Sequence, residues 1–199
     1  MSTQQRLHDA LEELRELKQR LEQQNEYLQE EIRIEHSYRE IVGQSDSILK
    51  IVRQIDVVGP TDASVLIHGE SGTGKEVVAR CLHDFSPKAK SPFVAVNCAA
   101  IPAELVESEL FGYEKGAFTG ASHKGHIGLI RKAHKGTLFL DEICEMDLSL
   151  QTKLLRFLQT STIQPVGAAR PVQVDVRIVC ATNRDPAEEV RRGRFREDL

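Results

Sequence analysis

The sequence predicts an α/β fold in which helices cover both faces of a parallel β-sheet. Two observations lead to this prediction. Along residues 45–199, short apolar runs alternate with segments of helical pattern, which is typical of a parallel sheet. In addition, the apolar run 64–68 is followed by the glycine-rich segment 69–76 and then by a helical pattern. This order of strand, glycine loop and helix is that of a phosphate-binding loop.

The predicted helices and strands follow one another along the chain. Ser45 is expected to cap the first helix, because serine favours that position. We expect helices at 45–58, 74–83, 102–110 and 149–159, and strands at 65–68, 92–98, 137–140 and 174–181. In parallel sheets, ligands bind at the carboxyl ends of the strands. Since the glycine-rich segment follows the first strand, the ends of the other strands should complete the same site.

The segment 69–76 has the residue spacing of a Walker A motif. In such a motif backbone N–H groups and a helix N-terminus bind phosphate, and Lys75 stands where a lysine reaches the outer phosphates. Glu76 replaces the serine or threonine that usually offers a hydroxyl to Mg²⁺, so Glu76 is one candidate metal ligand. The predicted nucleotide-binding residues of this segment are Gly69, Glu70, Ser71, Gly72, Thr73, Gly74, Lys75 and Glu76.

Polar residues also end two later strands. The run that begins at Gly136 ends in Asp141 and Glu142, which predicts a Walker B strand, and we expect Gly136, Asp141 and Glu142 to contribute to nucleotide binding. There Asp141 would hold the metal and Glu142 would orient an attacking water. A carboxylate pair that only caps the next loop is the alternative, and the Walker A segment argues against it. Thr182 and Asn183 are placed to sense the γ-phosphate, although an ordinary turn would explain them as well.

Five glycines lie within or close to the segment 116–121: Gly112, Gly116, Gly120, Gly125 and Gly128. Each glycine destabilises a helix by about 1 kcal/mol relative to alanine, so we expect a mobile loop here. Phe118 lies at the tip of this loop. Its ring either packs inward or is offered to a partner, and the residues alone do not decide between the two.

Composition excludes several classes of protein. Residues 1–40 carry ten acidic and six basic side chains, so the remaining residues are neutral and lack the net charge of a nucleic-acid-binding surface. No apolar stretch approaches the length of a membrane span, and the polar start lacks the core of a signal peptide; we therefore expect a cytoplasmic location. The four dispersed cysteines predict buried, reduced thiols rather than a metal site. The basic cluster 184–196 is expected to be a solvated helix face.

The N-terminal region has a separate pattern. Leucines recur every seven residues, at Leu7, Leu14, Leu21 and Leu28. With these at heptad position d, Asn25 lies at position a and favours a parallel two-stranded coiled coil. A single amphipathic helix packed on its own domain is the alternative. We expect a coiled-coil linker helix over 1–36, a junction over 37–45 and the nucleotide domain over 42–199.

These motifs together resemble a known family. The segments that carry the resemblance are GESGTGKE at 69–76, GAFTGA at 116–121, GTLFLDE at 136–142, ATN at 181–183 and RFREDL at 194–199. In combination they resemble the AAA+ domain of bacterial enhancer-binding proteins, which are the ATPase activators of sigma-54 RNA polymerase. The resemblance extends from about Ile41 to Leu199. Within the family, LDEICEMD at 140–147 is similar to the quorum-sensing LuxO-like branch.

The resemblance implies a role for each motif. The Walker A segment would bind ATP, Asp141 would hold Mg²⁺ and Glu142 would activate water. Asn97 matches an asparagine that holds this glutamate inactive until a partner binds. Arg196 matches an arginine finger that acts on the site of a neighbouring subunit. The residues of the loop that would contact sigma-54, with Phe118 and Thr119 foremost, are Gly116, Ala117, Phe118, Thr119, Gly120 and Ala121.

The resemblance also implies how much of the family architecture is present. It predicts a three-layer αβα sheet domain without the last strand and helical lid, which would lie downstream with a DNA-binding domain. Relatives work as hexameric or heptameric rings, and a coiled-coil linker holds some of them as dimers. We therefore expect an ATP-hydrolysing module that remodels sigma-54 polymerase and contacts DNA only through a missing C-terminal domain. The alternative is a dimeric, non-catalytic regulatory fragment that binds nucleotide; an unrelated P-loop GTPase or kinase would leave the loop 116–121 unexplained.

Overall fold

The structure is a computed structural model that describes residues 18, 41, 45–118, 122 and 124–199. The predicted coiled coil lies outside these residues except for Lys18, which is helical and exposed. The chain divides into two units, Met1–Val42 and Gly43–Leu199, and the second holds the domain described below. None of the helices described is long and apolar enough to cross a membrane.

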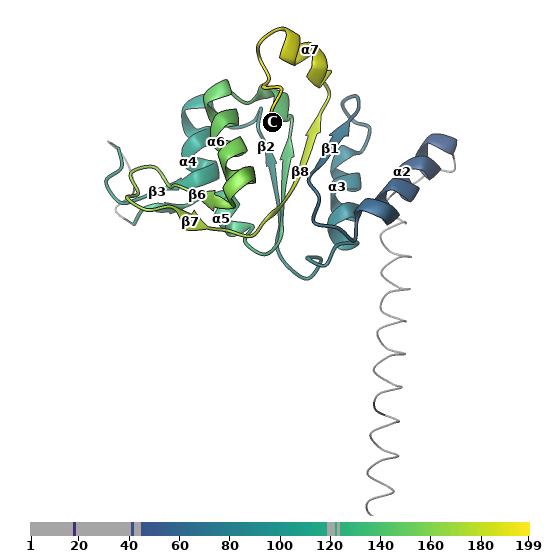
Figure 1. Cartoon of the computed structure of the whole chain (residues 1–199), viewed down its shortest axis with the longest axis horizontal. Helices are drawn as coiled ribbons and strands as arrows, with labels where there is room; N and C mark the ends of the chain where they lie inside the picture. The colour runs from purple at the N-terminus through teal and green to yellow at the C-terminus, as the bar shows by residue number, and fades with distance from the viewer. Residues whose placement is uncertain (1–17, 19–40, 42–44, 119–121, 123) are drawn as a thin grey trace, which may run out of the picture. The chain divides into compact units, whose positions relative to one another are not determined.

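A four-stranded parallel sheet forms the centre of the domain (Figure 1). Its strands, in spatial order, are β1 (Val65–His68), β8 (Arg177–Thr182), β5 (Thr137–Asp141) and β2 (Phe93–Asn97). The register pairs His68 with Thr182 and Asn97 with Asp141. The polar residues that end the strands therefore lie together at the carboxyl end of the sheet, as the sequence predicted. Strands β1 and β2 are its two edge strands.

Helices cover both faces of the sheet, so the predicted three-layer arrangement is confirmed. Helix α3 (Lys75–Asp84) packs on one face and is in turn contacted by α2 (Asp46–Val58). Helices α4 (Ala103–Phe111) and α6 (Leu148–Thr160) lie on the opposite side (Figure 1). The shorter elements are α5 (Leu129–Lys132), the 3-10 turn η1 (Ile143–Glu145) and α7 (Pro186–Arg191).

The side chains of β5 alternate between the two layers, as a buried strand requires. Leu138 and Leu140 belong to one buried cluster with Leu110 of α4 and Leu154 of α6. Phe139 points the other way, and its ring stacks on Phe93 at 6.2 Å. Its three central residues, 138–140, are all apolar because both faces of the strand are covered.

One charged residue closes the amino-terminal end of the sheet. Arg177, the first residue of β8, is only 1% exposed. Its guanidinium donates hydrogen bonds to the carbonyls of Val58, Gly59, Ala63 and Leu82, at 2.9–3.2 Å. Burial lowers the pKa of Arg177. This single side chain joins the end of α2, the segment before β1 and the end of α3.

The elements that carry the site agree with the predicted ranges to within a residue at either end. The last strand is the exception, because it begins at Arg177 instead of residue 174. Two short antiparallel pairs were not predicted. They are β3 (Gly112–Tyr113) with β4 (His126–Ile127), and β6 (Thr162–Ile163) with β7 (Val172–Gln173). Residues 174–176 lead from β7 into the sheet, which explains the late start of β8.

A cleft of about 340 Å³ lies along β1 beside α2. It is lined by Ile51 and Ile55 of α2 and by Leu66 of β1, among others. Leu66 is 49% exposed. Among the residues that the structure describes, β1 pairs with β8 alone, so its second backbone edge carries no ladder.

Candidate functional site

The glycine-rich segment between β1 and α3 is shaped to receive an anion. Gly72 and Gly74 have φ angles of 79° and 84°, in the left-handed region that glycine alone adopts without strain. A Cβ atom on either residue would meet nothing within 4 Å, so the loop leaves open space beside its backbone. Helix α3 begins at Lys75 with no side chain capping its N-terminus. The N–H groups of its first turn are thus available to a phosphate.

The ends of three strands meet around Lys75. Its ammonium group donates to the carbonyls of Gly69, at 3.0 Å, and Glu70, at 3.2 Å. The same group lies 3.8 Å from a carboxylate oxygen of Glu142, at the end of β5. The second oxygen of Glu142 accepts the backbone N–H of Asn183, just after β8, at 3.2 Å. The side chains of Lys75 and Glu142 are 7% and 15% exposed, so most of their surface is shielded from solvent.

The chain turns sharply at Glu142. Its φ of 53° is left-handed, which is unusual for a residue other than glycine. The N–H of Glu142 donates to Asp141 Oδ1 at 3.0 Å. This turn aims the Glu142 carboxylate across the end of β8 and leaves Asp141 at the end of β5. Backbone strain of this kind is concentrated at functional sites.

Two predicted residues make other contacts. The side-chain oxygen of Asn97 accepts the backbone N–H of Ala99 at 2.9 Å, whereas the contacts of Glu142 are with Lys75 and Asn183. The carboxylate of Glu76 is paired with Arg80, one turn further along α3, at 3.0 Å. Asn97 is therefore near this edge of the sheet without touching Glu142, and Glu76 points along the exposed face of its helix.

Gly136 lies apart from the other predicted nucleotide-binding residues. It precedes β5, at the opposite end of this strand from Asp141. A Cβ atom at Gly136 would come 1.9 Å from the carbonyl oxygen of Pro92. A close approach of two backbones thus explains this glycine, and we leave it out of the proposed site.

The donors around the loop fit a magnesium nucleotide better than a resident metal. Among the described residues, no group of three or more His, Cys, Asp and Glu side chains is placed to hold a metal ion. Mg²⁺ is commonly held by one or two carboxylates together with the phosphates of the substrate. Asp141, at the carboxyl end of β5, can supply such a ligand. The thiol of Cys98 is buried, and burial, with the charges of Asp141 and Glu142, raises its pKa to about 12.

The stem of the loop 112–128 is held by stacked rings. Phe118 packs edge-on against Tyr113, with ring centroids 5.0 Å apart, and remains 43% exposed. Tyr113 stacks on His126 at 5.6 Å. Nε2 of His126 is 3.4 Å from a carboxylate oxygen of Glu109, without hydrogen-bond alignment. Of the predicted partner-binding residues, Gly116, Ala117 and Phe118 are described, whereas Thr119, Gly120 and Ala121 lie outside the described residues.

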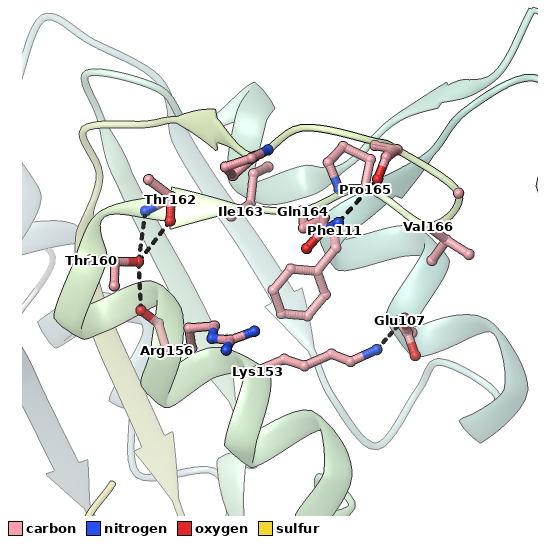
Figure 2. Close-up of a pocket in the computed structure, with 13 residues that line it drawn as sticks. Glu107, Phe111, Lys153, Arg156, Thr160, Thr162, Ile163, Gln164, Pro165 and Val166 are labelled. Atoms are coloured by element: carbon pink, nitrogen blue, oxygen red, sulfur yellow. Dashed lines mark hydrogen bonds and ion pairs between the residues drawn. The ribbon is translucent and has the colours of Figure 1, made fainter.

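The hairpin of β6 and β7 is hydrogen-bonded to this stem, a connection that the sequence did not predict. The N–H of Glu114 donates to the carbonyl of Val166, and the N–H of Val166 donates to the carbonyl of Gly112, both at 2.9 Å. Beside this hairpin lies a cavity of about 450 Å³ (Figure 2). Figure 2 shows the ring of Phe111 among the lining residues, between β6 and the side chains of Lys153 and Arg156, and the ion pair between Lys153 and Glu107 at one side. Turn residues at 165–167 were the only local signal for this hairpin.

Arg196 lies near the C-terminal end of the described chain. Its guanidinium forms a two-pronged ion pair with Asp198, at 2.8 and 2.7 Å, and donates to the hydroxyl of Thr152 at 3.2 Å. The ion pair lowers the pKa of Asp198. The contacts of Arg196 are thus with its own segment and α6, and not with the residues around Lys75.

The comparison with known families decides the assignment. Residues 41–199 match the family model described as the sigma-54 interaction domain. The chain belongs to this family. The family assignment made from the sequence motifs is thereby confirmed, together with the α/β P-loop fold.

Relatives of this sigma-54 interaction domain include a close match in the LuxO branch. The luminescence regulatory protein LuxO of Vibrio campbellii is 57% identical over 163 residues, which cover 82% of this chain and 36% of LuxO. Among solved structures, NtrX from Brucella abortus gives a TM-score of 0.73 at 38% identity, covering 86% of this chain and 38% of NtrX. NtrX in complex with ATP gives 0.71 at 39% identity, covering 79% and 35%. The chain thus spans about a third of the length of these proteins.

Proposed function

We propose that this chain is the ATP-hydrolysing module of a sigma-54-dependent transcriptional activator, and that it couples nucleotide turnover to contact between the loop 116–121 and sigma-54. The observation that carries the proposal is the meeting of Lys75, Glu142 and Asn183 beside an uncapped helix N-terminus and an open glycine loop. The family supports the partner, and the ATP complex of NtrX supports the nucleotide.

Each residue of the site has a defined task in this proposal. Lys75 leaves the carbonyls of its own loop and binds the outer phosphates. Asp141 would hold Mg²⁺, which would neutralise charge on the phosphates. Glu76, the second candidate ligand, would first have to leave its ion pair with Arg80. Glu142 orients the attacking water and accepts its proton. Thr182 and Asn183, at the end of β8, report the γ-phosphate to the rest of the domain.

Two further residues act through a partner. Asn97 holds Glu142 inactive until sigma-54 binds, which requires a side-chain rotation away from the N–H of Ala99. Arg196 acts on the nucleotide of a neighbouring subunit in a hexameric or heptameric ring, where such fingers contribute about 10³–10⁵ in rate. The coiled coil over 1–36 holds the dimer from which the ring assembles.

The first test is nucleotide turnover by the purified chain over a range of protein concentrations. Phosphate release should rise more than linearly with concentration, because each site needs its neighbour, and it should vanish in Lys75→Ala and Asp141→Ala. Lys132→Ala, which changes an exposed lysine on α5, is the control and should behave as wild type. Binding of ATP without turnover at any concentration would instead favour the non-catalytic regulatory fragment.

The second test concerns the loop. Phe118→Ala should abolish binding to sigma-54 in the presence of an ATP transition-state analogue. In a separate assay with ATP, the same variant should still release phosphate. Leu148→Ala is the matched control, because Leu148 is exposed to a similar extent, 45% against 43%. Unchanged sigma-54 binding by Phe118→Ala would refute the loop assignment.

A further inference from the structure

The backbone that carries Arg196 is fixed by a buried amide. Gln151, in the first turns of α6, is fully buried. Its Nε2 donates to the carbonyls of Met146, at 2.7 Å, and Arg194, at 2.9 Å. Its Oε1 accepts the backbone N–H of Arg196 at 2.9 Å. One side chain therefore binds the peptide groups on either side of Phe195.

The chemistry of these contacts leaves little choice of side chain. Gln151 faces two acceptors and one donor, which matches an amide with its two N–H groups and its carbonyl. Exchanging the amide nitrogen and oxygen would set an oxygen against both carbonyls, so the contacts fix the orientation. A glutamate would place a charge there. An apolar residue would leave one buried and two partly buried backbone groups without this partner.

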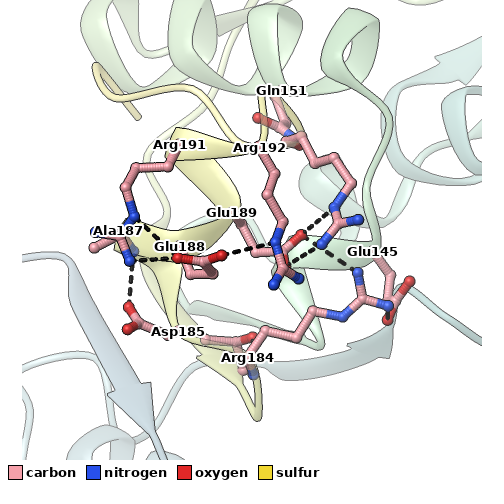
Figure 3. A network of polar contacts seen from close by, with 11 residues as sticks. Glu145, Gln151, Arg184, Asp185, Ala187, Glu188, Glu189, Arg191 and Arg192 are labelled. Atoms are coloured by element: carbon pink, nitrogen blue, oxygen red, sulfur yellow. Dashed lines mark hydrogen bonds and ion pairs between the residues drawn. The ribbon is translucent and has the colours of Figure 1, made fainter.

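The same segment is held from its other side by α7. Both carboxylate oxygens of Glu189 accept hydrogen bonds from the guanidinium of Arg194, at 2.7 and 2.6 Å. The carbonyl of Glu189 accepts the N–H groups of Arg194 and Phe195. Figure 3 shows Gln151 above this network, with Glu189 at its centre. Residues 194–196 are thus hydrogen-bonded to both α6 and α7. The side chain of Arg196 is not covered by these contacts and stays 35% exposed.

We propose that Gln151 is a positioning residue for Arg196: its amide fixes the backbone of residues 194–196 to α6 and so determines where the guanidinium is offered to a neighbouring nucleotide site. This inference rests on the trans role of Arg196 in the proposed function. Gln151 also contacts Met146, four residues after Glu142, so the finger is anchored to the turn that follows the Walker B strand. Misplacing a reacting group by about 1 Å can cost about 10²-fold in rate, which sets the scale of the effect.

The test uses mixed subunits to distinguish a subunit that supplies Arg196 to its neighbour from a subunit whose nucleotide site receives it. Lys75→Ala keeps Arg196 but cannot turn over nucleotide, and Arg196→Ala keeps the nucleotide site but lacks the finger. Each should be inactive alone, and their mixture should release phosphate. Adding Gln151→Met to the Lys75→Ala partner should lower the mixed rate at least tenfold. Adding it to the Arg196→Ala partner should leave the mixed rate within twofold. Gln159→Met, an exposed glutamine on the same helix, should change neither mixture.

A second readout does not depend on turnover. Amide hydrogen exchange at Arg196, measured on Gln151→Met without nucleotide, should be faster by tenfold or more, while exchange in β5 is unchanged. Equal losses of rate when Gln151→Met is placed in either partner, or unchanged exchange at Arg196, would overturn the inference alone. A mixture of the two parent variants that stays inactive would instead overturn the trans role of Arg196, and the inference with it.

Discussion

The two ends of strand β8 differ in the contacts that their residues make. At its amino end, the guanidinium of buried Arg177 joins four backbone carbonyls, none of which belongs to the residues around Lys75. At its carboxyl end, Thr182 and Asn183 adjoin the left-handed turn at Glu142 and the lysine of an open loop. The first end holds the layers together, and the second leaves polar groups ready for a ligand. Stability and chemistry should therefore be separable by mutation along one strand.

The largest expected effect is at the amino end. Arg177→Met should lower the free energy of unfolding by about 3 kcal/mol or more, because each buried carbonyl left without a donor costs about 1–3 kcal/mol. Urea unfolding followed by circular dichroism measures it. Arg170→Met, at an exposed arginine, is the control. A loss below about 1 kcal/mol would mean that water replaces the guanidinium and that this end is not the stabilising one.

At the carboxyl end, Glu142→Gln should have the opposite profile. Phosphate release should fall by about 100-fold or more, because the amide cannot accept the proton of the attacking water. The unfolding free energy should change by less than about 0.5 kcal/mol, since the amide oxygen can still accept the N–H of Asn183. Glu104→Gln, on the exposed start of α4, is the control. A stability loss like that of Arg177→Met would break the comparison.

The smallest expected effect is a pH dependence at the Glu189 network. The hydrogen bond from Arg194, followed by the charges of Arg194 and Arg184, lowers the pKa of Glu189 from its ordinary value of 4.5. The folded state therefore holds this proton less tightly than the unfolded state. Its contribution to stability is present above pH 4.5 and is lost as the pH falls through the lowered pKa.

In Glu189→Gln, this part of the acid-induced loss should disappear, so that the urea midpoint changes less steeply below pH 4.5 than in the wild type. The matched variant is Glu188→Gln, whose more exposed carboxylate pairs with Arg191 and Arg192 on the surface of α7. An identical acid profile for Glu189→Gln and the wild type would show that the Arg194 contact persists in the unfolded chain or is worth nothing.

The nucleotide end of the domain was predictable because its signals are local. A few neighbouring residues are enough to predict the conformation of each segment there. These segments are the strand Val65–His68, the glycines of the Walker A segment and the apolar run before Asp141. Ser45 was correctly expected to cap α2, and its side chain accepts the N–H of Ile48. Parallel order then follows from alternation of the elements, which brings the strand ends to one edge.

The remaining features depend on contacts distant in sequence. The strands of the two hairpins have two residues each, and the hydrogen bonds of Val166 to Gly112 and Glu114 span more than fifty residues, which no local pattern encodes. Gly136 was assigned to the nucleotide because it begins the Walker B run, whereas its close neighbour is Pro92.

The basic cluster 184–196 was expected to be a solvated helix face. Arg191 and Arg192 do lie exposed at the end of α7. Arg184 and Arg194, also partly exposed, pair in addition with Glu189, a carboxylate that is almost fully buried. Each of these two arginines is five residues from Glu189, which is not the spacing of three or four at which side chains face each other on one helix, so the helical pattern did not predict these pairs. The coiled coil over 1–36 lies outside the described residues and stays a prediction.

The open side of β1 has a practical consequence for handling the protein. Within the part of the chain that the structure describes, the outer edge of β1 pairs with no strand, and half-exposed Leu66 and the cleft beside α2 lie next to it. Such an edge is a template onto which an extended peptide can add by main-chain hydrogen bonding. Concentrated preparations should accordingly be prone to edge-to-edge association, and a lysine in place of Leu66 should keep them in solution for longer.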